Sequence, residues 1–546
     1  MYPEVNRIIN STAFRRMQDK TQFYYSYKGD HYRTRLTHSI EVMMIAERIA
    51  VSLLDTLKRF QAKNNENISL LSRKCWINNI DVALTRSIAL LHDIGHTPFG
   101  HIGERTLSSI LCGKDNLGDL ISINIKRSCF KHNINSLRLI LESLSKDERK
   151  TLPWQIFDGV CKHTSVTNKD NSIGDDPYRI NSLIVNTPLN NLTSVKYSQH
   201  SAALSIEGQI VAIADEIAQR ISDFDDMVRA GDFNNACFDL IDGLRILKEN
   251  FADRLDVVDE QDILYIEDVI GDSRDNSIVR GQKELFEKIN EIILRYTKHN
   301  ADGTKEVKHE DVIPNLQTFL INEVVSGTIK NLFAKDTELS HAVMKDNSVL
   351  QGSMVFVKSI DEVSKSKKAS SLIAFGTIGE KVNGVFENLS SNQVIPSYEI
   401  RRCDSISSHI IRQLFKAYYN DPSQMSDKSI RDIFTDVIDY CNRNNKLILK
   451  SVICEFNKQS LYDSITNVQN ERDFRETLKE LEKCVKQFNA LPENNSEEIP
   501  IKEKRENGVK KHIGEIYLRH IAYYIAGMTD SFALEEYKKL YGISLP

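Results

Sequence analysis

The sequence has little glycine, little proline and no closely paired cysteines. Its 546 residues include 23 glycines and 11 prolines, fewer than a turn-rich β architecture needs, so a mainly helical fold is favoured. None of the nine cysteines has CxxC spacing, which argues against a zinc ribbon or a thioredoxin-type site. Because the number is odd and the first residues do not resemble a secretory leader, we expect reduced thiols and a cytoplasmic protein.

The chain also lacks an excess of positive charge and any long apolar run. Its formal net charge is −5, so no general basic field indicates binding to nucleic acid or to a membrane surface. No uninterrupted apolar stretch reaches the roughly 20 residues of a membrane-spanning helix, and no membrane partner is expected. Hydrophobic residues make up 41% of the chain, enough for a large core, and the length predicts two or more structural units.

The spacing of apolar residues predicts four helices in the first half of the chain, over residues 38–57, 81–92, 132–145 and 205–229. The stretch 164–200 is rich in polar residues and is expected to be a loop or lid. In the first helix, the residues that broadly follow the helical period are Ile40, Met43, Met44, Ala46 or Glu47, Ala50, Val51 and Leu54.

The second half has a different character. Helical segments alternate with charged turns, and the β-rich pieces Met354–Val357 and Leu372–Phe375 suggest a small α+β insert. Residues 492–511 contain almost no apolar side chains and are expected to be a linker before a final helix over 513–540. We therefore expect three regions: a core over 1–235, a mostly helical region over 236–511, and a C-terminal helix over 512–546 that packs back on the core.

The most informative stretch lies between residues 92 and 104. It contains the adjacent pair His92 and Asp93, then His96, His101 and Glu104, directly after an apolar run. A nitrogen ligand beside a carboxylate ligand suits a divalent ion of the manganese-to-zinc group. Such an ion could lower the pKa of a water and polarise a phosphoryl oxygen. The alternative is a set of polar surface residues on a loop that follows a core helix.

Two more residues could complete a coordination sphere. Asp215 lies within an apolar run that predicts a buried helix, where an ionised carboxylate needs a partner or a metal. His38 stands at the start of the first predicted helix. Taken singly, Asp215 could lie on an exposed face and His38 could be a cap or a packing residue. Together they give the order His, His-Asp, Asp on three helices.

This order resembles that of the HD-domain metal-dependent phosphohydrolases. Longer segments are similar to the deoxyguanosine triphosphate triphosphohydrolase branch of that family, strongly over residues 5–232 and 512–542 and little between 235 and 511. The segments that carry the resemblance are Gln18–Phe23, Arg33–Val42, His92–Glu104, His132–Asn133, Ser205–Asp215 and Tyr524–Asp530.

The resemblance implies a bundle of helices around one divalent metal (manganese, magnesium or iron). Its expected ligands are His38, His92, Asp93 and Asp215. The implied reaction is hydrolysis of a deoxynucleoside triphosphate to the deoxynucleoside and inorganic tripolyphosphate, because water attacks the α-phosphorus.

Other residues receive expected roles. His101 and Glu104 are three residues apart, so they share a helix face. We expect His101 to donate a proton to the leaving oxygen or to position the water, while Glu104 orients His101. The alternative for Glu104 is a helix cap. The resemblance assigns His132 a catalytic role at the triphosphate. It also implies substrate contacts by Gln22, Arg35, Asn133, Lys162 and Asp223.

Two positions depart from the family pattern. Gln219 stands where relatives usually have tyrosine, and Ser222 replaces a common histidine. Both lie past Asp215 on the same predicted helix. They leave the preferred nucleobase and the strictness of deoxyribose selection open.

The family also predicts partners and regulation. We expect a homo-oligomer, from dimer to hexamer, with a nucleotide or single-stranded nucleic acid as an allosteric ligand, in deoxynucleotide-pool control or in defence against phage. Two other functions remain open: an HD phosphohydrolase acting on a 5′-monophosphate, cyclic or alarmone nucleotide, and a nucleotide-sensing regulatory protein.

Overall fold

The computed structural model describes ten stretches of the chain, and all regular elements in them are helical. The fold is thus mainly α-helical, as the composition predicts. The described residues are 2–22, 33–63, 80–121, 129–163, 203, 205–229, 309–333, 372–391, 398–443 and 501–542. The predicted loop over 164–200 and the segment Met354–Val357 lie outside them.

The chain divides into two compact units that interleave along the sequence. Unit 1 comprises Met1–Gln18, Gln22–Ile94 and Ser136–Arg401, and unit 2 comprises Asp19–Thr21, Gly95–Asn135 and Arg402–Pro546. The stretch from residue 92 to residue 104 is therefore shared between them.

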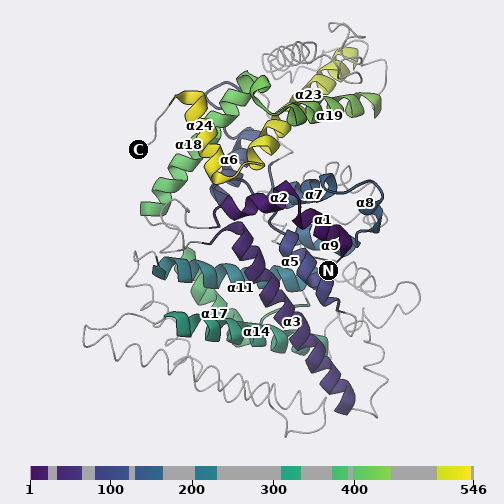
Figure 1. The fold of residues 1–546 in the computed structure, drawn as a ribbon, viewed down its shortest axis with the longest axis vertical. Helices are drawn as coiled ribbons and strands as arrows, with labels where there is room; N and C mark the ends of the chain where they lie inside the picture. Colours follow the sequence, from purple (N-terminus) through teal and green to yellow (C-terminus); the bar gives the residue numbers. More distant parts are fainter. Residues whose placement is uncertain are drawn as a thin grey trace. The chain divides into compact units, whose positions relative to one another are not determined.

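Unit 1 is built around the long helix α3 (Figure 1). Helices α5 and α11 both pack against α3, and α9 packs on α5 and α11. Helix α14 contacts α3, and α17 contacts α14 and α11. The helices of unit 1 are α1 (Pro3–Ile9), α2 (Thr12–Arg15), α3 (Arg35–Lys63), α5 (Val82–Leu91), α8 (Glu148–Thr151), α9 (Trp154–Lys162), α11 (Ile206–Arg229), α14 (His309–Phe333) and α17 (Thr377–Leu389), with the 3-10 turn η1 (Arg16–Asp19) at its edge.

The four helices predicted for the first half are confirmed. They correspond to α3, α5, α7 (His132–Glu142) and α11. Helix α5 begins where the side chain of Asp81 accepts a hydrogen bond from Leu84 N at 3.0 Å, an N-cap that satisfies an otherwise unpaired amide. It ends at Leu91, so that His92 and Asp93 follow directly.

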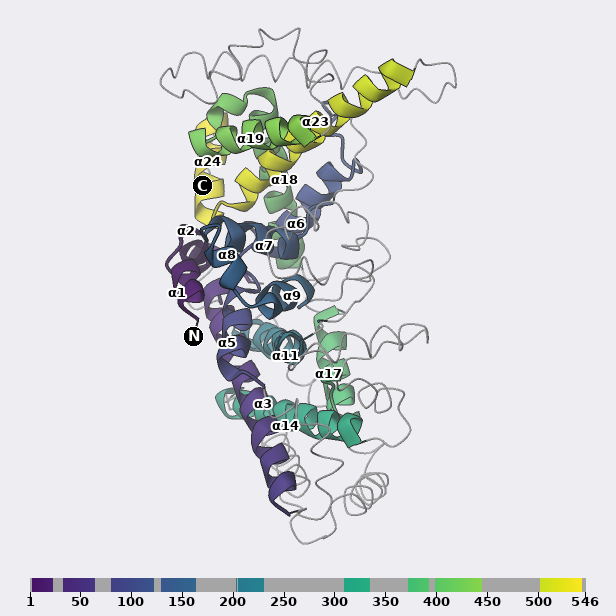
Figure 2. The same cartoon turned by 90° about the vertical axis from the view of Figure 1, so that its right-hand side faces the viewer.

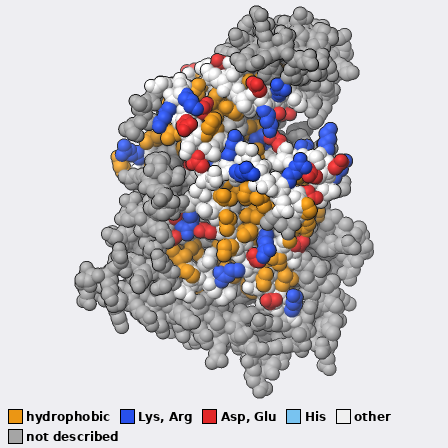
Figure 3. Space-filling model, viewed as in Figure 1, with side chains coloured by type: hydrophobic (Ala, Val, Ile, Leu, Met, Phe, Trp, Pro, Cys, Tyr) orange, Lys and Arg blue, Asp and Glu red, His pale blue; other side chains and the backbone are white. Residues whose placement is uncertain are grey.

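The predicted apolar stripe of α3 is fully buried only at Ala46 and Ala50. Met44 is 57% exposed and Ile40 and Val51 are 40% exposed. Figure 3 shows hydrophobic side chains gathered on the face of the molecule that carries α3. The helix is apolar on more than one side, so its periodicity alone did not select the face that α5 and α11 cover. The side chains that face the core are Val42, Ile45, Ala46, Ile49, Ala50, Leu53 and Leu57.

Two glycines let α9 and α11 approach closely. A Cβ atom added to Gly208 would lie 3.0 Å from the Cα of Gly159, and one added to Gly159 would lie 2.7 Å from a methyl group of Ile88. Helix backbones can come this near only where side chains are absent. The crossing brings the end of α9 next to α5 and α11.

The segment Leu372–Phe375 is not the expected strand. Leu372 N and Ile373 N both donate hydrogen bonds to the side-chain oxygen of Gln209, at 3.0 and 3.3 Å. Gln209 lies on α11, so a helix side chain takes the place of a neighbouring strand. The apolar side chains of Leu372 and Ile373 are buried.

Unit 2 is also helical, and its helices are labelled in Figure 2. Helix α19 packs against α23, and α23 packs against α6. The tyrosine hydroxyl of Tyr517 donates to the carbonyl of Tyr419 at 3.1 Å, which joins α23 to α18. The helices are α6 (Gly100–Leu111), α18 (Tyr398–Asn420, in this unit from Arg402 on), η9 (Pro422–Gln424), α19 (Asp427–Arg443), α23 (Ile501–Ala526) and α24 (Asp530–Tyr541).

The expected linker and the single final helix are both corrected. Helix α23 begins at Ile501, so residues 501–511 are helical; lysine, glutamate and arginine are good helix formers even without apolar neighbours. The final stretch is two helices, because Thr529 caps a new helix by accepting a hydrogen bond from Phe532 N at 3.2 Å.

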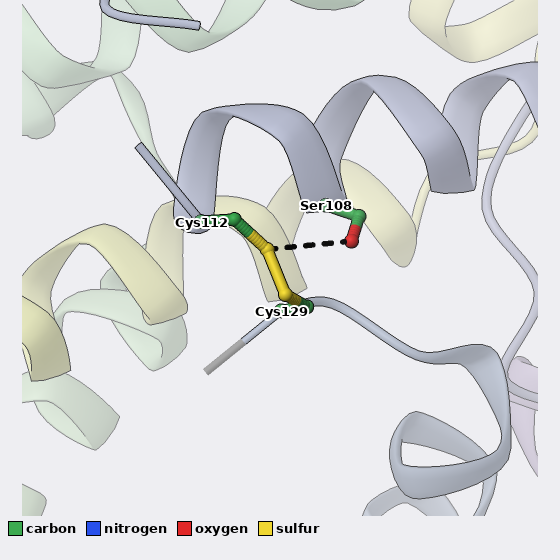
Figure 4. Close-up of a disulfide and its surroundings, with 3 residues drawn as sticks. All are labelled: Ser108, Cys112 and Cys129. Carbon is green, nitrogen blue, oxygen red and sulfur yellow. Dashed lines mark hydrogen bonds between the residues drawn. A yellow bond between two sulfur atoms is a disulfide. The ribbon is translucent and has the colours of Figure 1, made fainter. Parts of the chain in front are cut away.

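The expectation that all cysteines are reduced is also corrected. Cys112, at the end of α6, forms a disulfide with Cys129, and their Cα atoms are 5.1 Å apart (Figure 4). The 17-residue separation of the pair is not a recognisable spacing, so only the fold brings the two sulfurs together. Cys161 and Cys403 are buried thiols. Among the described residues, none of the helices is long and apolar enough to cross a bilayer.

Asp530 ties together three parts of unit 2 that are far apart in sequence. Its carboxylate accepts hydrogen bonds from Thr21 N at 3.0 Å, from the Thr21 hydroxyl, and from Phe99 N at 2.8 Å. Phe99 has a left-handed backbone (φ 61°) where α6 begins. A buried acceptor with three donors therefore fixes the entry into the helix that carries His101 and Glu104.

We predict that Asp530→Ala lowers the free energy of unfolding by on the order of 3 kcal/mol, because two buried backbone amides lose their acceptor. Chemical denaturation of the full chain measures this. Asp530→Asn should lose less, since its amide oxygen still accepts. Ser531→Ala is the control, because the Ser531 hydroxyl donates to Asp19 at an exposed position. Equal stability of the wild type and Asp530→Ala would contradict the prediction.

Candidate metal centre and histidine cluster

Four predicted ligands meet in the core of unit 1. His38 comes from α3, His92 and Asp93 follow α5, and Asp215 comes from α11. His38 Nε2 donates a hydrogen bond to Asp215 Oδ1 at 2.8 Å. His92 Nε2 lies 3.5 Å from the same oxygen and 3.6 Å from Asp93 Oδ1. The structure therefore brings together the four residues that sequence spacing alone left on three separate helices.

His92 is oriented by its own helix. Its Nδ1 donates to the carbonyl of Ala89 at 2.6 Å, which leaves Nε2 facing the two carboxylates. That buried Nε2 has no hydrogen-bond partner among the described residues. Burial disfavours the charged imidazole, but Asp93 and Asp215 outweigh it and raise the pKa of His92 to about 9. The two aspartates thus stabilise a positive charge at His92 Nε2.

The donor set fits a divalent metal. The ligand atoms of His38, His92 and Asp93 lie within 4.8 Å of one another. Burial alone would raise the pKa of Asp215, yet His92 and His38 hold it well below its usual range, so the carboxylate is ionised. Imidazole nitrogens with ionised carboxylates are ligands that manganese, iron and related ions accept.

Arg35 contacts a predicted ligand directly. Its Nη1 donates to Asp93 Oδ2 at 2.7 Å, and its Nη2 donates to the carbonyl of Gln22 at 3.3 Å. Both Arg35 and Gln22 are buried. Arg35 therefore fixes the orientation of Asp93, the kind of support that metal ligands usually receive. Its predicted contact with phosphate stays a prediction.

Helix α9 brings two further groups to this core. Lys162 is buried, and its Nζ lies 3.6 Å from Asp158 Oδ1; burial lowers its pKa, with Asp158 opposing the shift. His163, the next residue, was not among the predicted site residues. Its Nε2 lies 3.8 Å from Asp93 Oδ1. A sequence signal for it did exist, since His163 follows an apolar helix just as His92 does.

Asp223 lies two turns beyond Asp215 on α11 and is buried. Nearby, Arg33 binds the carboxylates of Glu41 and Asp225, each at 2.8 Å, and of Asp226 at 2.5 Å. Arg33 therefore links three carboxylates, those of Glu41, Asp225 and Asp226, near the C-terminal end of α11.

Unit 2 holds a cluster of histidines around Glu104. His132 donates to Glu104 twice, from Nδ1 at 2.9 Å and from its backbone N at 3.1 Å. His101 Nδ1 lies 3.7 Å from the same carboxylate oxygen, and its side chain is 46% exposed. The ring of His96 stacks on that of His132, with centroids 3.9 Å apart. Glu104 thus makes its closest contacts with His132, whereas the sequence favoured His101 as its partner.

The electrostatics of this cluster favour a negative Glu104. Burial alone would raise the pKa of Glu104, but His132 and His101 hold it well below its usual range. Asn133, also predicted, is buried beside His132. Lys20 was not predicted as a site residue; its Nζ donates to the carbonyl of His96 and, at 2.9 Å, to that of Ala526. Lys20 therefore holds the backbone on which His96 stands.

Comparison with known protein families places these clusters in context. Residues 35–219 match the HD domain, and residues 447–539 match the phosphohydrolase-associated domain. The first match runs from α3 to just past Asp215 and contains all four predicted ligands. The second extends into residues 447–511, where the sequence alone suggested little resemblance.

Curated relatives carry the name deoxyguanosinetriphosphate triphosphohydrolase-like protein. The protein of Sinorhizobium medicae (strain WSM419) is 32% identical over 49% of this chain and 59% of its own length. That of Brucella ovis is 36% identical over 41% and 46%, and that of Bradyrhizobium diazoefficiens is 31% identical over 57% and 64%. The chain thus spans about half to two thirds of these relatives. The chain therefore contains an HD domain, and over about half of its length it is similar to deoxyguanosinetriphosphate triphosphohydrolase-like proteins.

Proposed function

We propose that this protein is a metal-dependent hydrolase that converts deoxynucleoside triphosphates to deoxynucleosides and inorganic tripolyphosphate. The observation that carries the proposal is the meeting of His38, His92, Asp93 and Asp215 in one buried cluster. The names of the relatives support the substrate class. A divalent ion held by these residues would polarise a phosphoryl oxygen and supply an activated water.

The chain's own residues would then hold the substrate and move a proton. We assign the proton donor to His101, whose exposed ring lies 3.7 Å from Glu104; such hydrogen bonds often shorten only when substrate binds. Glu104 would hold the proton on the histidine's Nδ1 side and stabilise the imidazolium. His132, fixed by the same carboxylate, would donate from Nε2 to the triphosphate, and Asn133 and Lys162 would add contacts to it.

Asp223 and Gln22 would bind the deoxyribose. The Gln22 side-chain oxygen is buried with no hydrogen-bond partner among the described residues. Burial, together with Asp226, raises the pKa of Asp223 to about 8 against the opposing charges of Arg220, Arg35 and Arg33. A carboxyl group held neutral in this way can donate as well as accept, which suits a sugar hydroxyl. The preferred base stays open.

Regulation and assembly are proposed only from the family. We expect a homo-oligomer whose turnover responds to a second nucleotide or to single-stranded nucleic acid, with a role in deoxynucleotide-pool control or in defence against phage. A cytoplasmic location accords with these roles.

The reaction is tested by incubating the full chain with each deoxynucleoside triphosphate, alone and in pairs, with manganese or magnesium. We expect deoxynucleoside and tripolyphosphate in equal amounts by chromatography, and turnover of one nucleotide that changes when a second is present. His92→Ala and Asp93→Asn should reduce turnover to background. Release of orthophosphate or pyrophosphate instead would favour a different nucleotide hydrolase, and turnover indifferent to other nucleotides would contradict the regulation.

The proton-transfer assignment predicts a pattern of losses. His101→Asn and Glu104→Gln should each lower kcat by about 10²- to 10⁴-fold, while metal content measured by atomic spectrometry stays at the wild-type level. If the two residues act as a unit, the double variant should be little worse than either single one. If the fold-loss in kcat of the double variant instead equals the product of the two single losses, Glu104 acts through His132. Glu142→Gln, on the exposed side of α7, is the control for loss of a carboxylate.

Asp223 predicts a pH-dependent effect on stability. A carboxyl with a pKa of about 8 when folded and about 4 when unfolded binds more protons in the folded state, so its contribution to stability falls as pH rises from 4 to 8. Asp223→Asn cannot ionise, so its melting temperature should exceed that of the wild type by a margin that grows between pH 5 and pH 8.5. The exposed Asp147→Asn controls for lost charge. A constant margin would refute the prediction.

A further inference from the structure

His163 repeats the construction of His92. Each histidine is the residue at which a helix ends, His92 after α5 and His163 after α9. Each donates from Nδ1 to a carbonyl three residues earlier, His92 to Ala89 at 2.6 Å and His163 to Val160 at 2.7 Å. A carbonyl can only accept, so Nδ1 carries the proton, and in the neutral ring Nε2 keeps its lone pair. In both imidazoles, Nε2 can therefore act as a metal ligand.

The two Nε2 atoms converge on the same oxygen. His92 Nε2 lies 3.6 Å and His163 Nε2 lies 3.8 Å from Asp93 Oδ1. The rings stand edge to face, with centroids 4.9 Å apart, so neither blocks the other's nitrogen. The ligand atoms of His92, His163 and Asp215 also lie within 4.8 Å of one another. His163 Nε2 thus lies near Asp93, and the ligand atom of His163 lies near that of Asp215.

These separations suit ligands of a common ion better than hydrogen bonds. At 3.6 to 3.8 Å a nitrogen and a carboxylate oxygen are too far apart for a hydrogen bond. Two ligands that each lie about 2.1 Å from one ion are about 3.0 to 3.4 Å apart at octahedral or tetrahedral angles, so a small inward shift would meet them. His163 is also only 4% exposed, which leaves solvent little access to its ring.

We infer that His163 is a fifth ligand of the metal centre, beside His38, His92, Asp93 and Asp215. The inference rests on the proposed metal centre but does not depend on the proposed substrate. Three imidazole nitrogens and two carboxylates make a nitrogen-rich set, whereas magnesium prefers oxygen ligands. The site should therefore prefer a transition ion such as manganese, iron or cobalt over magnesium.

The test measures cobalt binding to the full chain after chelation, by titration and by visible absorption. Loss of an outer partner of a metal ligand commonly weakens metal binding 10- to 100-fold, so loss of a ligand should cost at least about tenfold. We expect His163→Gln and His163→Ala to bind Co²⁺ at least tenfold more weakly than the wild type. Their absorption bands should also shift, because one nitrogen leaves the coordination sphere.

His520→Gln is the matched control. His520 is also buried and lies 2.9 Å from the Asp436 carboxylate, and it stands on α23 in unit 2. Its variant should bind Co²⁺ as the wild type does. Melting curves of the metal-free proteins identify a variant that fails to fold. If His163→Ala fails, Co²⁺ binding is compared between the wild type and His163→Gln, which keeps a polar side chain of similar reach.

Two outcomes overturn the inference, and they are distinguishable from failure of the proposed function. Wild-type affinity and spectrum in both folded His163 variants would show that His163 is not a ligand, even if nucleotide turnover falls. Absence of Co²⁺ binding in the wild type would remove the metal centre itself, and with it the proposed function. Weaker Co²⁺ binding in a protein that hydrolyses no nucleotide would support the ligand and reject only the substrate.

Discussion

The structure of unit 1 depends on the burial of two carboxylates, Asp93 and Asp215, in a helical core. Ionised carboxylates are costly to bury unless positive charge or hydrogen bonds compensate them. Here the compensation comes from Arg35 and His38 on α3 and from His92 at the end of α5. The apolar faces of α3, α5 and α11 hold these helices together, and the polar ends of the same helices supply the site.

The local sequence explains why the site is rigid on one side. His92 and His163 are both fixed by carbonyls of their own helices, so no loop has to position them. The close crossing at Gly159 and Gly208 sets the distance between α9 and α11. A side chain at either glycine would separate the helices that carry His163 and Asp215. Backbone packing thus controls the geometry of ligands that are several residues away.

Much of this could be predicted from the sequence, and the failures have physical causes. The dense run from His92 to Glu104 pointed to the candidate ligands His92 and Asp93, because ionisable residues rarely follow a core helix so closely. The face of α3 could not be predicted, because that helix is apolar on several sides and its partners decide which side is buried. Leu372 and Ile373 look like a strand, but the Gln209 side chain satisfies their amides. The disulfide of Cys112 and Cys129 depends on contacts that sequence spacing does not encode.

Two buried ionisable groups, Lys162 and Asp223, fit the proposed nucleotide ligand. Lys162 and Asp223 both have pKa values shifted toward the neutral form by burial, so each lowers the stability of the folded chain when it is charged. Apolar residues of similar size would avoid this cost. A polyphosphate would favour the charged form of Lys162, and a sugar hydroxyl would use the neutral form of Asp223. The two pKa shifts run in opposite directions but have the same main cause, because burial favours the neutral form of each group. Shifts of this kind gather at functional sites, where a bound ligand can offset the cost of burial.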